Sequence, residues 1–196
     1  MRKIIVSEFI TLDGVIQAPG GADEDRDGGF EHGGWTWPYW DDAIGQHLVG
    51  AIGQSESILL GRKTWQTHAE AFEPMAEGDP HEPGLNRLSK YVVSNTLTSA
   101  DAWRNSTIIS GDVIGQIREL KAGDGGDILV DGSSVLVHAL VENDLVDEFN
   151  LMVYPIVLGS GKKLFPEGTR VNMRLVESTP VSTGVVVTHY VVDHPA

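Results

Sequence analysis

Residues 127–134 read DILVDGSS, and this short stretch combines a strand, a turn and the start of a helix. The apolar residues 128–130 predict a buried strand that ends at Gly132. Ser133 or Ser134 then begins a helix, with apolar positions 136, 139 and 140 on one face. A glycine followed by hydroxyl side chains at a helix start suits a bound pyrophosphate, although a plain helix cap has the same pattern.

The same order of elements recurs along the chain. Predicted strands cover residues 3–10, 57–60, 91–93, 107–109 and 127–130, and predicted helices begin at Asp41 or Asp42, near Lys63 and after Asp112. This alternation predicts an α/β fold with a largely parallel sheet flanked by helices. Two long apolar strands, residues 149–158 and 185–192, follow each other without a helix between them. They predict an antiparallel carboxyl-terminal edge on a mixed sheet.

Length and composition limit the possible functions. The 196 residues suit one domain, in which residues 19–40 form an acidic loop rich in glycine and tryptophan. A net charge of −14 argues against a nucleic-acid partner, and the absence of cysteine excludes disulfides and thiolate metal sites. Glu8 interrupts the apolar start, and no apolar run is long enough to span a bilayer, so we expect a cytoplasmic protein without a membrane partner.

Two further turns follow predicted strands. In LLGRKTW, residues 59–65, a strand ends at Gly61, and Arg62 and Thr64 lie at the start of a helix, where free N–H groups and an arginine fork suit phosphate. In VVSNT, Ser94 follows another strand. Each could be an ordinary surface turn. Because carboxyl ends of parallel strands meet at one sheet edge, the three turns together favour a dinucleotide.

The stretch LGSGKKLF, residues 158–165, only partly resembles a P-loop. Gly159 and Gly161 are too close together, and Lys163 stands where the motif needs Ser or Thr. A kinase is therefore not predicted. Gly159 is better interpreted as part of a turn near the same ligand.

Five blocks resemble the dihydrofolate reductase-like family, in the branch that contains the reductase domain of riboflavin biosynthesis. In chain order they are SEFITLDG, LGRKTW, VVSNT, DILVDGSS and LVDEFNLMVYPIVLGSGKKLF. The resemblance implies an α/β sheet and NADPH as hydride donor. It also implies roles for individual residues: Gly61, Arg62 and Thr64 at the adenosine side, Ser94 at the 2′-phosphate, Gly132, Ser133 and Ser134 at the pyrophosphate, and Thr11, Asp13 and Gly14 by the nicotinamide and substrate.

The chain departs from true folate reductases at its first helix. Those enzymes carry a carboxylate facing the pterin, whereas here Asp41 and Asp42 lie about one turn early and Gly45 stands near that position. Asp13 and Asp42 are therefore candidate catalytic residues, as proton donor or substrate anchor. The alternatives are a turn aspartate for Asp13 and a helix cap for Asp42.

An unusual aromatic segment lies between the first strand and the first helix. Residues 28–42 read GGFEHGGWTWPYWDD, and Trp35, Trp37 and Tyr39 on this glycine-rich loop could fold over a flat substrate and exclude water. Alternatively, these side chains pack onto their own domain or onto a dimer partner.

The same loop half-matches a calcium motif. Asp23, Asp25 and Asp27 precede Gly28, but Gly34 stands where a bidentate glutamate should close the loop. The histidines form no spaced ligand pair, and we predict no metal site.

The sequence as a whole predicts an NADPH-dependent reductase of a small heterocyclic or sugar-like substrate, such as a pyrimidine-ribose or pterin compound. The alternatives are a non-catalytic ligand-binding protein on the same fold and, more remotely, a calcium-binding module. We also expect a homodimer, because the long apolar carboxyl-terminal strands leave a surface to cover.

Overall fold

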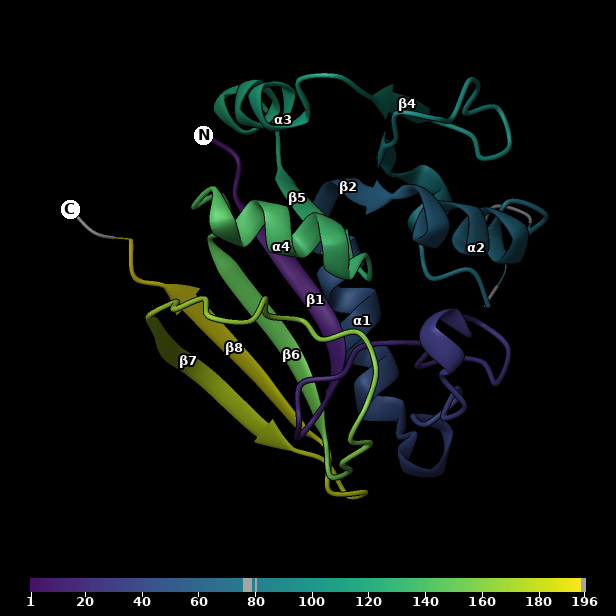
Figure 1. Ribbon diagram of the computed structural model, residues 1–196, viewed down its shortest axis with the longest axis vertical. Coiled ribbons are helices and arrows are strands. Elements are labelled where there is room, and N and C mark those ends of the chain that lie inside the picture. The colour runs from purple at the N-terminus through teal and green to yellow at the C-terminus, as the bar shows by residue number, and fades with distance from the viewer. Residues whose placement is uncertain (76–78, 80, 195–196) are drawn as a thin grey trace.

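A computed structural model describes residues 1–75, 79 and 81–194 of the chain (Figure 1). Its strands are β1 (Ile4–Thr11), β2 (Ser55–Gly61), β3 (Ser89–Val93), β4 (Ser106–Ile109), β5 (Asp127–Asp131), β6 (Glu148–Tyr154), β7 (Met173–Pro180) and β8 (Val186–Val192). Its helices are α1 (Asp42–Gln54), α2 (Arg62–Phe72), α3 (Val113–Ala122) and α4 (Ser134–Glu142), with 3-10 turns at Asp27–Gly29, Trp37–Tyr39 and Leu85–Arg87. None of the helices in these described ranges is long and apolar enough to cross a membrane.

One sheet runs through the whole molecule. Its 8 strands lie in the order β4-β3-β2-β5-β1-β6-β8-β7. The first six strands in this order, from β4 through β6, run parallel to one another. Strand β8 then pairs antiparallel with β6 on one side and with β7 on the other. The predicted α/β class, with a largely parallel sheet and an antiparallel carboxyl-terminal edge, is confirmed.

Helices cover both faces of the sheet (Figure 1). On one face, α3 and α4 bury Ile117, Leu136 and Val137 against the central strands. On the other face, Ile44 of α1 and Trp65 of α2 pack against the sheet. Because the faces are filled by helices, the carboxyl ends of β1, β2, β5 and β6 remain as the place where loops can gather around a ligand.

The carboxyl-terminal edge differs from the prediction in one respect. The predicted strand of residues 149–158 ends at Tyr154, where Pro155 follows and offers no N–H for the ladder. The outermost strand is β7, which the sequence did not indicate. Its residues are mostly exposed and do not alternate between apolar and polar, so they lack the period-two pattern of a half-buried strand.

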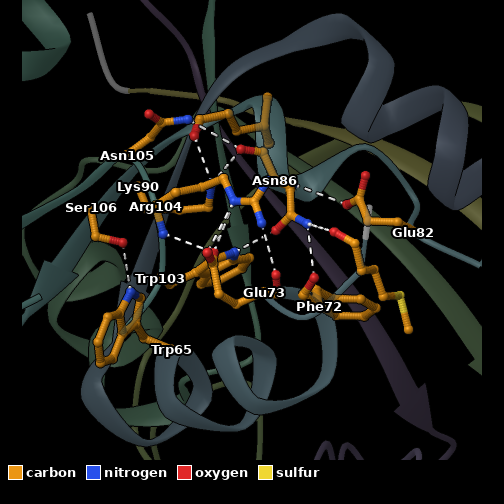
Figure 2. A network of polar contacts seen from close by, with 12 residues as sticks. Trp65, Phe72, Glu73, Glu82, Asn86, Lys90, Trp103, Arg104, Asn105 and Ser106 are labelled. Carbon is orange, nitrogen blue, oxygen red and sulfur yellow. Dashed lines mark hydrogen bonds and ion pairs between the residues drawn. The ribbon is translucent and has the colours of Figure 1, made fainter. Parts of the chain in front are cut away.

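A buried polar network joins the turn before β3 to the amino-terminal ends of β3 and β4 (Figure 2). The Lys90 ammonium donates to the carbonyls of Asn86 (3.0 Å) and Leu88 (2.9 Å) and lies 4.7 Å from the centroid of the Trp103 ring. The indole N–H of Trp103 donates to the Asn86 side chain (2.6 Å). Burial lowers the pKa of Lys90 to about 8. This cluster lies at the amino ends of parallel strands, opposite to the edge expected to bind ligands, and we assign it a structural role.

Candidate cofactor and substrate site

The turns after β2 and β5 touch each other through one serine. The backbone N–H of Gly61 donates to Ser133 Oγ (2.8 Å), and Ser133 Oγ donates to Thr64 Oγ1 (2.9 Å). Gly132 has φ +63°, and a Cβ placed there would lie 2.8 Å from Thr64 Cγ2. Only glycine therefore fits between these turns. The structure brings together the residues that the sequence assigned to two separate phosphate-suited turns.

Two helices begin at this junction without a side-chain cap. Helix α2 has Gly61 as its N-cap, and α4 has Ser133, whose hydroxyl is used on the neighbouring turn and not on its own helix. Ser133 also adopts the left-handed conformation with φ 67°, which a non-glycine residue adopts only at a cost. No side chain in the described part of the chain caps the first N–H groups of α2 or those of α4, which begin at Ser134, and these groups are suited to an anion.

Two predicted 2′-phosphate ligands flank this junction. Arg62 is exposed, and its guanidinium makes a long contact to Gln66 Oε1 (3.5 Å), so it can turn toward a ligand. Ser94 follows the neighbouring strand β3 and is buried. Its Oγ accepts from the N–H groups of Thr96 (3.2 Å) and Leu97 (3.0 Å), so this hydroxyl closes its own turn.

The turn after β1 is tied to the turn after β6. Thr11 Oγ1 donates to Asp13 Oδ1 (2.6 Å), and Asp13 also accepts from the N–H groups of Leu158 (3.2 Å) and Gly159 (2.7 Å). The Thr11 hydroxyl bond and the two backbone bonds hold the pKa of Asp13 below its usual value. Asp13 is thus an ionised acceptor that fixes the two turns to each other, with Gly159 at φ +77°.

Asp42 occupies a different environment. It is exposed in the first turn of α1, and the N-cap is its neighbour Asp41, which accepts from the N–H of Ala43 (2.9 Å) and from the Ser182 hydroxyl. The capping role considered for Asp42 therefore belongs to Asp41. The carboxylate of Asp42 faces solvent.

The aromatic segment splits into a buried and an exposed part. Trp35 is buried, its indole N–H donates to the carbonyl of Gln17 (2.8 Å), and its ring lies edge-on to Tyr154 at 5.2 Å between centroids. Tyr39 also packs edge-on against Tyr154, at 6.1 Å. Trp37 is 63% exposed; its ring is tilted by 42° against that of Trp40 at 5.9 Å between centroids, and its indole N–H donates to the carbonyl of Gly20 (2.6 Å). Trp35 and Tyr39 therefore pack onto the domain, whereas Trp37 stays available to a ligand.

Basic residues neutralise the acidic part of the loop. Asp27 pairs with Lys63, at the start of α2, and with Lys162 (2.9 Å), in the turn after β6, and Asp25 pairs with the same Lys162. The pairs of Asp27 with Lys63 and with Lys162 hold the pKa of Asp27 below its usual value. Asp23 pairs with Arg26. The half-matched calcium motif is thus a set of ion pairs that pins the loop across the carboxyl edge of the sheet. Within the described ranges, no three His, Asp or Glu side chains are grouped to hold a metal ion.

Two buried groups lie at this edge. The sequence indicates Tyr154 only as a place to seek the substrate if the aromatic loop is structural, and it does not indicate Glu8 as a site residue. Tyr154, at the end of β6, is fully buried; its hydroxyl has no hydrogen-bond partner among the described residues, and burial raises its pKa. Glu8, in β1, was noticed only as a charge that interrupts an apolar run, yet it is buried near Gly132. The sequence signal that could have identified Glu8 is a carboxylate at a position of the predicted strand that faces the core.

Two surface cavities lie elsewhere. The larger, of about 430 Å³, is lined by Phe149 and Val192 at the opposite end of the sheet, with Arg170 beside them. The smaller, of about 150 Å³, lies between α1 and the β7–β8 pair and includes His47 and Glu177. Neither includes the paired turns.

With this fold and junction in place, comparison with known proteins identifies the class. Residues 2–187 match the RibD C-terminal domain, and the chain belongs to this family. The predicted resemblance to the reductase domain of riboflavin biosynthesis is confirmed.

The chain is also similar to individual proteins in sequence and in fold. The chain is 30% identical over 190 residues to the uncharacterized Bacillus subtilis protein YyaP, covering 94% of this chain and 92% of that protein. It shares its fold with a Shewanella sp. PV-4 protein named for riboflavin biosynthesis (TM-score 0.68, 21% identity, 98% and 99% coverage of the two chains). It also shares its fold with a pyrimidine reductase-like protein of Corynebacterium diphtheriae (TM-score 0.65, 13% identity, 99% and 93% coverage).

Proposed function

We propose that the chain is an NADPH-dependent reductase of a small heterocyclic substrate, of the pyrimidine-ribose or pterin kind. The observation that carries the proposal is the contact of Ser133 with Gly61 and Thr64, because it places two uncapped helix starts side by side. Membership of the RibD C-terminal domain family supports the reductase class.

The residues present suit a dinucleotide phosphate. The free N–H groups of α4 would hold the pyrophosphate, and those of α2 would assist. Exposed Arg62 offers a bidentate fork to a 2′-phosphate, with Ser94 as a further donor. Such local donors are needed because the net charge of −14 on the chain repels an anionic ligand. When bound there, NADPH would supply a hydride, and the substrate would take up one proton from a protein group or water.

The chain's own residues would orient the substrate and keep out water. Thr11, Asp13 and Gly159 fix the turns after β1 and β6. In this proposal, Trp37, which is exposed like its neighbour Trp40, would close over a flat ring. Asp13 suits an anchor better than a proton donor, because its pKa is lowered. Asp42 has an exposed carboxylate and is the remaining candidate for proton transfer.

One observation favours the non-catalytic alternative. Tyr154 is fully buried beneath Trp35 and Tyr39, so the substrate side of β6 is filled by the protein's own aromatic rings. A protein that binds a nucleotide without reducing a substrate needs no space for a substrate beside β6, so these aromatic rings would not impair its function.

Turnover separates the two functions. NADPH oxidation is followed with a panel of pterins, pyrimidine-ribose compounds and quinones, with NADPH alone as the blank. Substrate-dependent oxidation by the wild type, lost in Gly132→Val, is the expected result, because the larger side chain fills the junction. Tight NADPH binding without oxidation by any member of the panel would favour the non-catalytic alternative.

A further inference from the structure

Glu8 is a carboxylic acid enclosed in the core, and the register of β1 against β5, with Ser7 opposite Asp131, places it level with the Gly132 turn. Its side chain is 4% exposed and lies on the same side of β1 as Val6 and Ile10, the face covered by α4. Its neighbour on β6 is the apolar Leu151. A charged carboxylate in such surroundings is costly unless it is paired.

Among the residues that the structure describes, this carboxyl group has no cationic partner. Glu8 Oε1 has no hydrogen-bond partner among the described residues. Burial raises the pKa of Glu8 well above its usual value, and the negative charge of Asp131 raises it further, whereas the backbone N–H of Gly132 lowers it in part. Glu8 therefore keeps its proton at a higher pH than an exposed glutamate.

The charged groups around Glu8 can be named element by element. Asp131 comes from the end of β5, and His68 of α2 contacts Asp131 (2.8 Å between Nε2 and Oδ2) and not Glu8. On α4, His138 contacts the carbonyl of Lys163 (2.9 Å). Asp131 lies in register with Ser7 and contacts α2, so its side chain is on the face of the sheet opposite to Glu8. An ionised Glu8 would thus add a second negative charge near the Gly132 turn, on the face covered by α4.

We propose that Glu8 controls the cofactor seat through its proton, so that the Gly132–Ser134 turn accepts a pyrophosphate only while the Glu8 carboxyl is neutral. This inference rests on the proposed function, because it takes these N–H groups to bind an anionic dinucleotide. With Glu8 neutral, the positive ends of α2 and α4 face the charge of Asp131 without a second negative charge from Glu8. Ionised Glu8 competes for the N–H of Gly132 and repels the phosphates.

The test measures NADPH affinity by calorimetry from about pH 5 to about pH 9, in the wild type and in Glu8→Gln, which keeps the shape without an ionisable group. Above the pKa of Glu8, the wild type is expected to lose up to about tenfold in NADPH affinity per pH unit. Glu8→Gln should show only the shallow change that comes from the 2′-phosphate of NADPH, which titrates at about pH 6. Glu148→Gln is the matched control, since Glu148, on β6, is also a buried glutamate but pairs with Lys3, just before β1. It should keep the wild-type profile.

A second measurement needs no variant. Repeating the wild-type titration in buffers of different ionisation enthalpy should reveal proton uptake on NADPH binding above the pKa of Glu8, approaching one proton per ligand. Parallel pH profiles for the wild type and Glu8→Gln, or no proton uptake, overturn the role of Glu8 but leave the reductase proposal intact. Failure of NADPH to bind at any pH overturns both.

Discussion

The Ser133 hydroxyl accepts a hydrogen bond from the backbone N–H of Gly61 across 72 positions of sequence, at 2.8 Å. This bond joins the ends of β2 and β5 and sets the starts of α2 and α4 beside each other. The junction leaves little room for a larger side chain at Gly132, and the effect of substitution there is the first property to test.

Gly132→Ala should destabilise the protein by about 1–3 kcal/mol, because the new Cβ would meet Thr64 Cγ2 at 2.8 Å and the residue has a positive φ. NADPH affinity should fall as well. Gly50→Ala in α1 is the control, since a Cβ there meets nothing within 4 Å, and alanine in a helix should stabilise by about 0.5–1 kcal/mol. Thermal unfolding of both variants measures the difference. A stable Gly132→Ala that binds NADPH normally would disprove the close packing of the junction.

Trp35→Ala and Trp37→Ala should behave differently. Truncating buried Trp35 should cost about 3–5 kcal/mol of stability, because its ring packs against Tyr154. Truncating exposed Trp37 should leave the melting temperature nearly unchanged and reduce substrate turnover, with NADPH affinity preserved. Trp40→Ala provides the control for exposed aromatic area. Normal turnover by Trp37→Ala would remove Trp37 from the substrate site.

Lys90 predicts a pH dependence of stability. Its pKa is about 8 in the folded chain, below the ordinary 10.5, because burial disfavours the charged form. Between these values the unfolded chain binds more protons, so stability should rise with pH by at most about 3 kcal/mol relative to Lys90→Met. Lys3→Met is the control: the pKa of Lys3 is raised by Glu148, so no such rise is expected in this window. Denaturant unfolding at several pH values checks this, and a constant difference between wild type and Lys90→Met would contradict it.

We expect a symmetric homodimer, formed through β7. This outermost strand exposes one edge of the sheet, and Val176 on it is 49% exposed. Val176→Lys should weaken the dimer, whereas Val49→Lys, at a similarly exposed valine of α1, should not. Light scattering at micromolar concentration distinguishes the states. A monomeric wild type would refute the expectation.

The sequence predicts local features of this molecule better than distant contacts. The strand–turn–helix at Gly132 could be predicted because glycine, hydroxyls and helical spacing stand together in the chain. Strand β7 could not, because an exposed edge strand needs no alternation of apolar residues.

Contacts between distant segments explain the rest of the site. Trp35 could be interpreted as a lid or as a packing residue until its partner Tyr154 was located, more than a hundred residues later. Likewise, nothing in residues 20–30 indicates that Lys63 and Lys162 neutralise Asp27. The local sequence pattern does not indicate which charged residue from a distant segment contacts a given side chain.

The central claim, that the paired turns hold NADPH, is tested most directly by calorimetric titration with NADPH and NADH. We expect NADPH to bind more tightly, and Arg62→Ala to weaken NADPH by about 1.5–3 kcal/mol with a smaller effect on NADH, as for a lost charge-assisted contact. Arg118→Ala, at an exposed arginine of α3, should leave both affinities unchanged. Equal affinities for NADPH and NADH, or no binding of NADPH, would contradict the claim.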